Sequence, residues 1–273
     1  MTEETAVREG RRKGGREARR AARAAPLPDD LRPIRAGLEG GVYRPLSEDQ
    51  VRRVHEAALD ALEQIGLADA IPSCIEYCTA AGAILGDDGR LRFPRAMVED
   101  MVAKAWRNRP LYGRDPLYDL HPQGKKVHFG TAGAATMMVD VEQRIYRNAT
   151  VQDLYDAARL VQQLDNIHFF QRPLTPCDVE TLEELDINTL YASIAGTTKH
   201  VGCSFTLGEN MPMVFDLLHA VAGGEAAWRE RPFVSNSNCF VVPPMKFAED
   251  ACRVLEACVH GGMPVLLLSA GQA

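Results

Sequence analysis

The fold class is decided by residues 200–224, HVGCSFTLGENMPMVFDLLHAVAGG. The apolar run at the start of this stretch predicts a buried β-strand over His200–Thr206. The next segment predicts a helix over Asn210–Ala222, and the pair Gly223-Gly224 gives that helix a stop signal. A strand followed directly by a helix of this length is the unit from which α/β proteins are built.

The same unit recurs along the chain. The predicted strands are Lys126–Gly130, Ile167–Arg172, His200–Thr206, Phe233–Phe240 and Pro264–Ser269. The predicted helices between them are Thr150–Leu164, Thr181–Ala195, Asn210–Ala222 and Lys246–His260. Reference residues Val127, His168, Val201, Phe233 and Val265 are separated by 41, 33, 32 and 32 residues. A predicted hairpin, Met137–Val141 with Arg144–Tyr146, lengthens the first interval. Repeats of this length indicate parallel strands joined by crossover helices.

Two architectures fit this pattern, a complete doubly wound sheet and a (β/α)8 barrel interrupted after its fifth strand. The first strand is not followed by G-x-G-x-x-G, because Gly130-Thr131-Ala132-Gly133 leads into the hairpin. The last strand runs into Ala270–Ala273 without a covering helix. We therefore expect an α/β fold that is a partial (β/α)8 barrel of the TIM type, with about five strands present and an N-terminal helical segment.

The domain prediction has three parts. Residues 1–30 are expected to be a disordered basic arm, residues 31–112 a helical segment, and residues 113–273 the first part of the barrel, apparently truncated. Residues 1–24 hold eight Arg or Lys and four Glu, a net charge of +4, which leaves −10 for the rest of a chain at −6. Such an arm is typical of a solvated tail, and we expect no nucleic-acid partner.

The helical segment carries local start and stop signals. Ser47 and Gln50 form a predicted capping box, and an apolar stripe from Val51 to Ile65 then continues to Gly66. Further helices are predicted around Ser73–Ala81 and Pro94–Trp106, with a turn at Gly86–Gly89 between them. Leu117–Leu120 is predicted to be a short strand.

Several classes of protein are excluded by composition. There is no run of eighteen apolar residues, and no apolar region follows the N-terminal charges, so neither a membrane span nor a signal peptide is expected. The seven cysteines contain no C-x-x-C pair. We expect reduced structural cysteines, no metal site and a cytoplasmic protein.

The working surface of either architecture lies at the carboxyl ends of the strands. No Asp, Glu or His occupies these ends, so the catalytic residues remain unknown; neutral amides and hydroxyls bind ligands rather than transfer protons. Arg172 has the permanent charge that suits a carboxylate or phosphate, and an aromatic ring such as Phe129 suits an alkylammonium ion. Of the adjacent Phe169 and Phe170, at most one faces the barrel interior. Alternatively, these polar side chains satisfy loop backbone. The predicted substrate-binding residues are Phe129, Gln171, Arg172, Ser204, Asn236, Asn238, Ser269 and Gln272.

Several short motifs, in this order and spacing, resemble the trimethylamine methyltransferase family. They are Leu31–Ile34, Ser47–Gly66, Gly113–Pro116, Lys126–Gly133, Arg147–Asp153, Asp165–Ile167 and Pro264–Ala273. The resemblance covers residues 31–273 but only the front half or so of a typical member. It implies a barrel that moves a methyl group from a tertiary or quaternary amine, such as trimethylamine or glycine betaine, to the cobalt of a separate corrinoid protein. No cofactor is then bound directly.

A second interpretation stays open at this point. The chain is then a non-catalytic half-barrel remnant or a small-molecule binding module, and not the N-terminal part of an enzyme. Unpaired sheet edges would also permit a homo-oligomer. If the chain is a fragment, we expect it to be inactive by itself.

Overall fold

The structure is a computed structural model that describes Arg20 and residues 43–107 and 109–268. Apart from Arg20, the predicted basic arm lies outside the described residues, as do Ser269 and Gln272. The described residues 43–107 and 109–268 belong to one compact unit. The boundary predicted between residues 112 and 113 stays a prediction.

A four-stranded parallel sheet confirms the predicted α/β class. Its strands are β5 (Phe170–Gln171), β6 (Val201–Cys203), β7 (Val234–Asn238) and β10 (Val265–Leu267). They pair in the order β10-β7-β6-β5, so strands that follow one another in the repeat are also neighbours in the sheet. Closure into an eight-stranded barrel stays a prediction.

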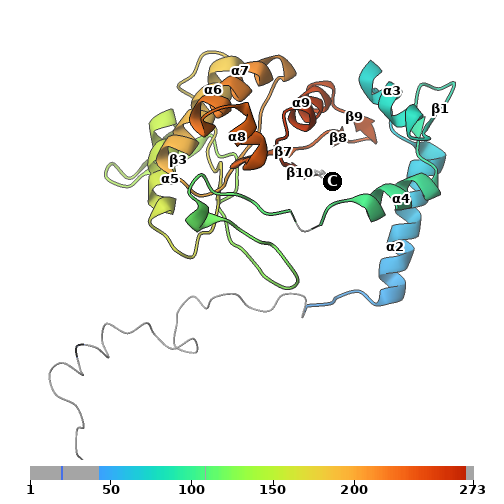
Figure 1. Ribbon diagram of the computed structural model, residues 1–273, viewed down its shortest axis with the longest axis horizontal. Helices are drawn as coiled ribbons and strands as arrows, with labels where there is room; N and C mark the ends of the chain where they lie inside the picture. Colours follow the sequence, from blue (N-terminus) through green and yellow to red (C-terminus); the bar gives the residue numbers. More distant parts are fainter. Residues whose placement is uncertain (1–19, 21–42, 108, 269–273) are drawn as a thin grey trace, which may run out of the picture. The chain divides into compact units, whose positions relative to one another are not determined.

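Helices occupy the connections between these strands (Figure 1). They are α6 (Leu182–Gly196) between β5 and β6, α7 (Met211–Ala222) and α8 (Glu225–Glu230) between β6 and β7, and α9 (Glu249–His260) between β7 and β10, while α5 (Val151–Gln162) precedes β5. Only α8 was not predicted, because six residues are too few for a periodic pattern. Its buried Trp228 donates a hydrogen bond from Nε1 to the Gly261 carbonyl, 2.8 Å away, which anchors α8 at the end of α9.

Two predicted strands are wrong. Leu117–Leu120 is not a strand, because Pro116–Tyr118 forms a 3₁₀ turn in which the Asp115 carboxylate accepts the Leu117 N–H. Lys126–Gly130 contributes only a single bridge between Gly130 and Phe169. The N–H of Phe129 donates to the His168 ring, 2.9 Å away, instead of to a strand carbonyl.

The helix predicted from Lys246 begins three residues later, at Glu249. Residues before it form a small hairpin of β8 (Val241–Val242) and β9 (Lys246–Phe247). The Phe247 N–H donates to the Ala68 carbonyl at 2.8 Å, so this segment is held as a strand by a partner far away in the sequence.

The N-terminal helices form where they were predicted, but the side chains that they bury are not the predicted ones. The elements are α2 (Glu48–Asp60), a π-helical turn (Ala61–Ile65), α3 (Pro72–Ala80), α4 (Arg95–Lys104) and the hairpin β1 (Ile84–Leu85) with β2 (Leu91–Arg92). The capping box of Ser47 and Gln50 is confirmed. In the predicted apolar stripe, however, Val51 is 50% and Val54 64% exposed, while the neighbouring Leu59 is buried.

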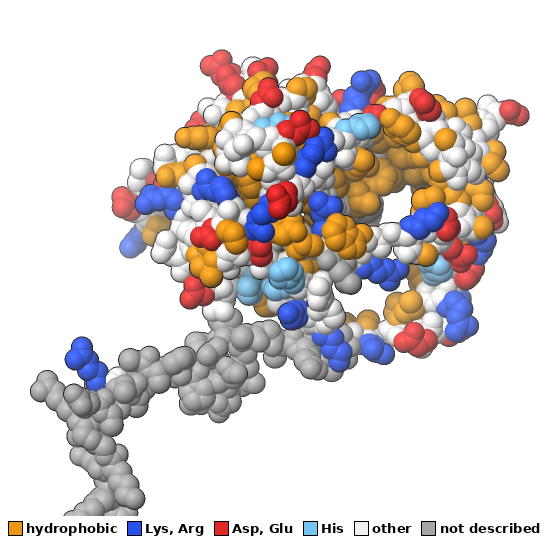
Figure 2. Space-filling view, in the orientation of Figure 1, with side chains coloured by type: hydrophobic (Ala, Val, Ile, Leu, Met, Phe, Trp, Pro, Cys, Tyr) orange, Lys and Arg blue, Asp and Glu red, His pale blue; other side chains and the backbone are white. Residues whose placement is uncertain are grey.

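Charges of both signs and apolar side chains are interspersed on the face seen in Figure 2. Within the described ranges, no helix is both long enough and apolar enough to cross a membrane.

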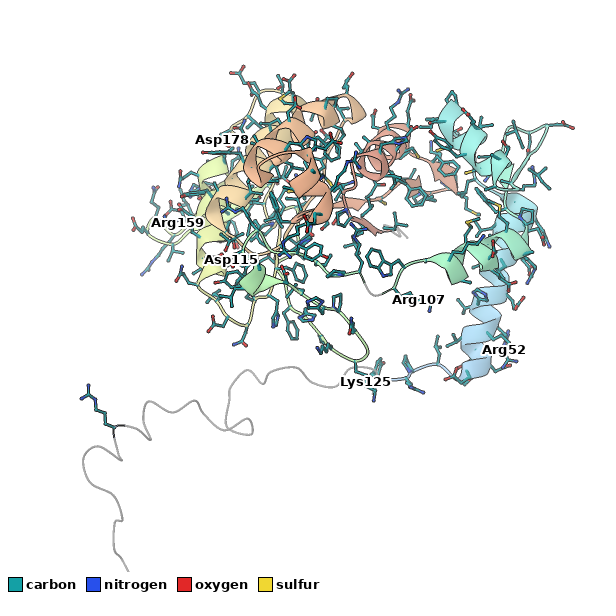
Figure 3. The ribbon with its side chains drawn as sticks, viewed as in Figure 1. Arg52, Arg107, Asp115, Lys125, Arg159 and Asp178 are labelled. Atoms are coloured by element: carbon teal, nitrogen blue, oxygen red, sulfur yellow. The ribbon has the colours of Figure 1, made fainter. Side chains whose placement is uncertain are left out.

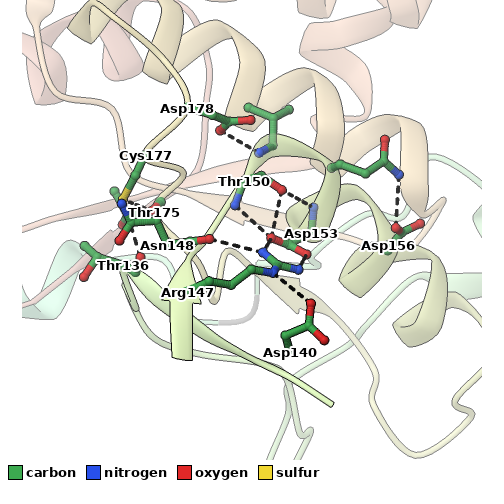
Figure 4. Close-up of polar contacts among 12 residues, drawn as sticks. Thr136, Asp140, Arg147, Asn148, Thr150, Asp153, Asp156, Thr175, Cys177 and Asp178 are labelled. Carbon is green, nitrogen blue, oxygen red and sulfur yellow. Dashed lines mark hydrogen bonds and ion pairs between the residues drawn. The ribbon is translucent and has the colours of Figure 1, made fainter. Parts of the chain in front are cut away.

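The segment Arg147–Asp153 joins the hairpin β3 (Met137–Asp140) and β4 (Ile145–Asn148) to the start of α5. Arg147 donates to both oxygens of Asp153, at 2.6 and 2.8 Å, and Thr150 caps the helix in a second capping box with Asp153 (Figure 4). Asp178, which follows β5, accepts the first helical N–H, whereas Arg159 projects from the outer side of α5 (Figure 3). These contacts explain why so many polar residues occur together in this motif.

Candidate functional site

The two faces of the parallel sheet differ in what covers them. Phe170, Val201 and Val234 are paired in register and belong to the buried core formed with α5, α6, α7 and α9. Side chains alternate along a strand, so the next paired row, Gln171, Gly202 and Ser235, lies on the opposite face. We call this opposite face the open face, because Gln171 and Ser235 remain half-buried.

The open face carries no charged side chain on the four described parallel strands, and Leu266 of β10, which pairs with Ser237, adds an exposed apolar residue to it. By the same alternation Ser237 belongs to it, and so does Ser204, directly after β6. Gln171 lies across Gly202, since a Cβ on that glycine would come within 1.8 Å of Gln171 Oε1. No hydrogen-bond partner for the Gln171 amide is found among the described residues. Phe169 lies over Gly130 in the same manner, which gives this face an aromatic ring.

Arg172, Asn236 and Asn238, all predicted to bind substrate, lie on the helix-covered face and are buried. The amide of Asn238 donates to the Ala251 carbonyl at 2.9 Å, and the amide oxygen of Asn236 accepts the N–H of Phe205 at 3.3 Å. These contacts match the alternative that the polar strand ends satisfy loop backbone. Each amide keeps one buried atom without a protein partner, Nδ2 of Asn236 and Oδ1 of Asn238, within the described part of the chain.

The Arg172 side chain is only 8% exposed, and its Nη1 has no partner among the described residues. Burial raises the pKa of the Cys203 thiol to about 12. The charge of Arg172 opposes this shift and that of Asp186 adds to it, so both residues lie close enough to Cys203 to act on it. Cys203 is thus a protonated thiol near neutral pH and does not serve as a nucleophile. An unpaired buried guanidinium is costly and is suited to an anionic group.

Asp186 fixes the loop that follows β6. Its buried carboxylate accepts hydrogen bonds from the Thr206 N–H and hydroxyl, at 3.0 and 2.9 Å, and from the Asn210 amide at 2.8 Å. These three bonds hold residues 204–210 against α6. The position of Ser204 at the edge of the open face therefore depends on a carboxylate on a helix.

Of the predicted set, the structure brings Gln171 and Ser204 onto one face. Phe129 is exposed and stacks on His168, with 6.5 Å between ring centroids. Phe169, Ser235 and Ser237 share the open face but were not in the predicted set. Strand alternation from Gln171 could have found Phe169, whereas placing Ser235 and Ser237 on this face requires the register between strands. Whether any of these residues binds a ligand stays a prediction.

Elsewhere, an acidic groove of about 680 Å³ runs along α9 and includes Glu209, Glu249 and Glu256. Part of its charge is compensated by the ion pair of Arg253 with Glu249 at 2.7 Å. It contains none of the predicted residues and does not adjoin the open-face row. In the described part of the chain, no cluster of three or more His, Cys, Asp or Glu side chains is arranged to hold a metal ion.

The parallel sheet and its connecting helices define an α/β protein, and comparison with known proteins narrows this class to one family. The family model described as trimethylamine methyltransferase (MTTB) matches residues 12–273. The chain therefore belongs to the trimethylamine methyltransferase family.

Curated relatives agree with this assignment. The chain is 28% identical over 239 residues to trimethylamine methyltransferase MttB of Desulfitobacterium hafniense, covering 87% of this chain and 48% of the relative. It is 25% identical to trimethylamine methyltransferase MttB1 of Methanosarcina mazei, covering 85% and 48%. It is 26% identical to a glycine betaine methyltransferase of Desulfitobacterium hafniense, covering 83% and 47%. The chain thus spans about half the length of the curated relatives it matches.

Proposed function

We propose that the chain forms part of a methyltransferase that takes a methyl group from a tertiary or quaternary amine. The observation that carries this proposal is the neutral open face of a sheet in a chain that belongs to this family. We further propose that the four parallel strands are part of a (β/α)8 barrel. The methyl acceptor expected for the family is the cobalt of a corrinoid on a separate protein, which also makes that protein the expected partner. A cytoplasmic location is part of the same proposal.

The chemistry fits a surface whose parallel strands carry no charged side chain. When a quaternary ammonium loses a methyl group, the C–N bond breaks, its electron pair stays on nitrogen, and a neutral amine leaves. No proton moves in this step, so position and charge complementarity matter more than a general base. The oxygens of Gln171 and Ser204, together with the Phe169 ring, can surround a positive head group without neutralising it.

Arg172 supports a finer assignment of substrate. Its buried, unpaired guanidinium is suited to the carboxylate of a betaine, a group that trimethylamine lacks. In this assignment the carboxylate reaches Arg172 past the carboxyl end of β5, and Asn236 and Asn238, at the carboxyl end of β7, are further proposed contacts. Phe129, Ser269 and Gln272 complete the proposed set of binding residues.

The test uses the complete gene product with its corrinoid protein and a panel of trimethylamine, glycine betaine and related amines. Corrinoid absorbance should change on addition of at least one of them. Replacing Gln171 with Ala should raise KM several-fold with a smaller effect on kcat, because a ground-state contact is removed. Replacing the exposed Gln152 on α5 with Ala is the matched control.

A half-barrel binding module is the second candidate, because the same uncharged open face suits binding of an amine without transfer of its methyl group. It requires saturable binding of an amine by the chain of residues 1–273 and no methyl transfer by the complete gene product. Absence of demethylation across the whole panel contradicts the methyltransferase proposal.

A further inference from the structure

The buried His200 directly precedes β6 and has two hydrogen-bond partners, one of which is Ser235 in the open-face row. Its Nδ1 lies 2.8 Å from the Tyr112 carbonyl oxygen, and its Nε2 lies 2.9 Å from Ser235 Oγ. The ring is 1% exposed. Burial lowers the pKa of His200 to about 4, so the ring is neutral near pH 7.

These partners determine where the protons lie. A carbonyl oxygen only accepts, so Nδ1 must carry the single ring proton and donate it to Tyr112. Nε2 is then bare and accepts the hydroxyl proton of Ser235. With its proton engaged, the Ser235 oxygen can offer only lone pairs to any further partner.

The register of the sheet places this oxygen in one row with Gln171. Ser235 pairs with Gly202, which pairs with Gln171, and the Gln171 amide lies over the glycine between them. Both side chains are half-buried, and no charged residue occurs on the four described parallel strands. The row therefore combines a fixed acceptor, an unpaired amide and no positive charge.

We propose that Ser235, oriented by His200, is a fixed hydrogen-bond acceptor for the cationic head group of a methylated ammonium ligand, with His200 as a positioning residue. This inference rests on the proposed function, since it names a contact for the same class of substrate. A cation is favoured because its polarised methyl hydrogens can face lone pairs, whereas an anion would be repelled by them.

The first measurement concerns the free chain. Nitrogen-15 NMR of His200 should report a protonated Nδ1 and an unprotonated, hydrogen-bonded Nε2, and replacing Ser235 with Ala should move the Nε2 resonance towards that of an unbonded nitrogen. A protonated Nε2 in the folded chain at neutral pH overturns the proposal. The wild-type chain suffices for this readout, so a variant that fails to fold does not weaken it.

The second measurement is binding, with tetramethylammonium and glycine betaine as probes and tert-butanol as the neutral probe of similar shape. Ser235→Ala should raise Kd for the cations about fivefold, the size expected for one lost hydrogen-bond contact, with little change for tert-butanol. Ser235→Thr should restore binding because it keeps the hydroxyl. Ser237→Ala, on the same strand and face without a histidine partner, is the matched control.

Equal losses for Ser235→Ala and Ser237→Ala overturn the proposal, as does the absence of saturable binding of either cation to the wild-type chain. The outcome is separable from that of the proposed function. Cation binding through Ser235 without methyl transfer by the complete gene product supports this inference and contradicts only the methyltransferase. Methyl transfer by the Ser235→Ala variant with unchanged KM supports the proposed function and contradicts this inference.

Discussion

Asp186 is the residue whose loss should cost the fold most directly. It is fully buried and accepts three hydrogen bonds from Thr206 and Asn210. Asp186→Asn turns one acceptor into a donor that faces other donors, so we expect the free energy of unfolding to fall by about 2 kcal/mol. Urea denaturation followed by circular dichroism measures this change.

Asp216→Asn is the control for that experiment, because Asp216 is exposed on α7. We expect its denaturation midpoint to stay close to that of the wild type. Equal midpoints for Asp186→Asn and the wild type would mean that Asp186 does not hold the loop after β6.

For single residues, the sequence predicts which polar side chains lie at strand ends better than it predicts which face of the sheet each one is on. Gln171 and Ser204 were identified because they lie at the carboxyl ends of predicted strands, and both belong to the open face. Arg172, one residue further along, belongs to the opposite face, because one step along a strand reverses the side chain. Ser235 was missed because its role depends on His200 in the neighbouring strand, and that pairing is set by the register.

Among the elements, the junction of β4 and α5 should depend on pH through Asp153. The hydrogen-bonded Arg147 guanidinium holds the pKa of Asp153 well below its ordinary value of 3.8. A depressed folded-state pKa contributes stability above the ordinary value and loses it as pH falls through the folded value. We expect Asp153→Asn to lower the free energy of unfolding by about 1–2 kcal/mol at pH 7.

The difference between Asp153→Asn and wild type should shrink as the pH is lowered below 3.8, because the carboxylate of the unfolded wild-type chain is protonated there while that of the folded chain is protonated only at lower pH. Thermal unfolding measured across this range tests the trend. Asp156→Asn, on the exposed side of the same helix, should show no comparable pH dependence. A constant difference at every pH would assign the stability to the Thr150 cap alone.

Helices were predicted more accurately than strands because their start signals are local. Ser47 with Gln50 marks a helix within four residues of sequence. Lys126–Gly130, in contrast, has strand-like composition but needs a neighbour to bond, and its Phe129 N–H is taken by the His168 ring. The stripe of α2 shows the other limit, because periodicity predicts an amphipathic helix without saying what covers it.

For the whole molecule, the outer edge of β10 should govern self-association. Leu267 is 58% exposed and its neighbours Leu266 and Leu268 are exposed too. In the described part of the chain, β7 is the only strand that pairs with β10. Exposed apolar edge strands attract further strands. We expect the chain to associate with increasing concentration and Leu267→Lys to weaken association at least several-fold.

Sedimentation velocity over a range of concentrations measures this association. Val259→Lys, which changes an equally exposed apolar residue on α9 away from the edge, is the control. If the two variants associate alike, hydrophobicity in general and not the strand edge is responsible.

Gly202 gives the binding surface a simple means of variation. The Gln171 side chain occupies the space that a side chain at position 202 would fill. The size of residue 202 therefore determines how closely the Gln171 amide can lie against the sheet. A methyl group at position 202 would push the Gln171 amide outward and leave less space for a ligand, although no residue that contacts the ligand would have changed. Ligand size can therefore diverge among related chains through a position that no inspection of contact residues would select.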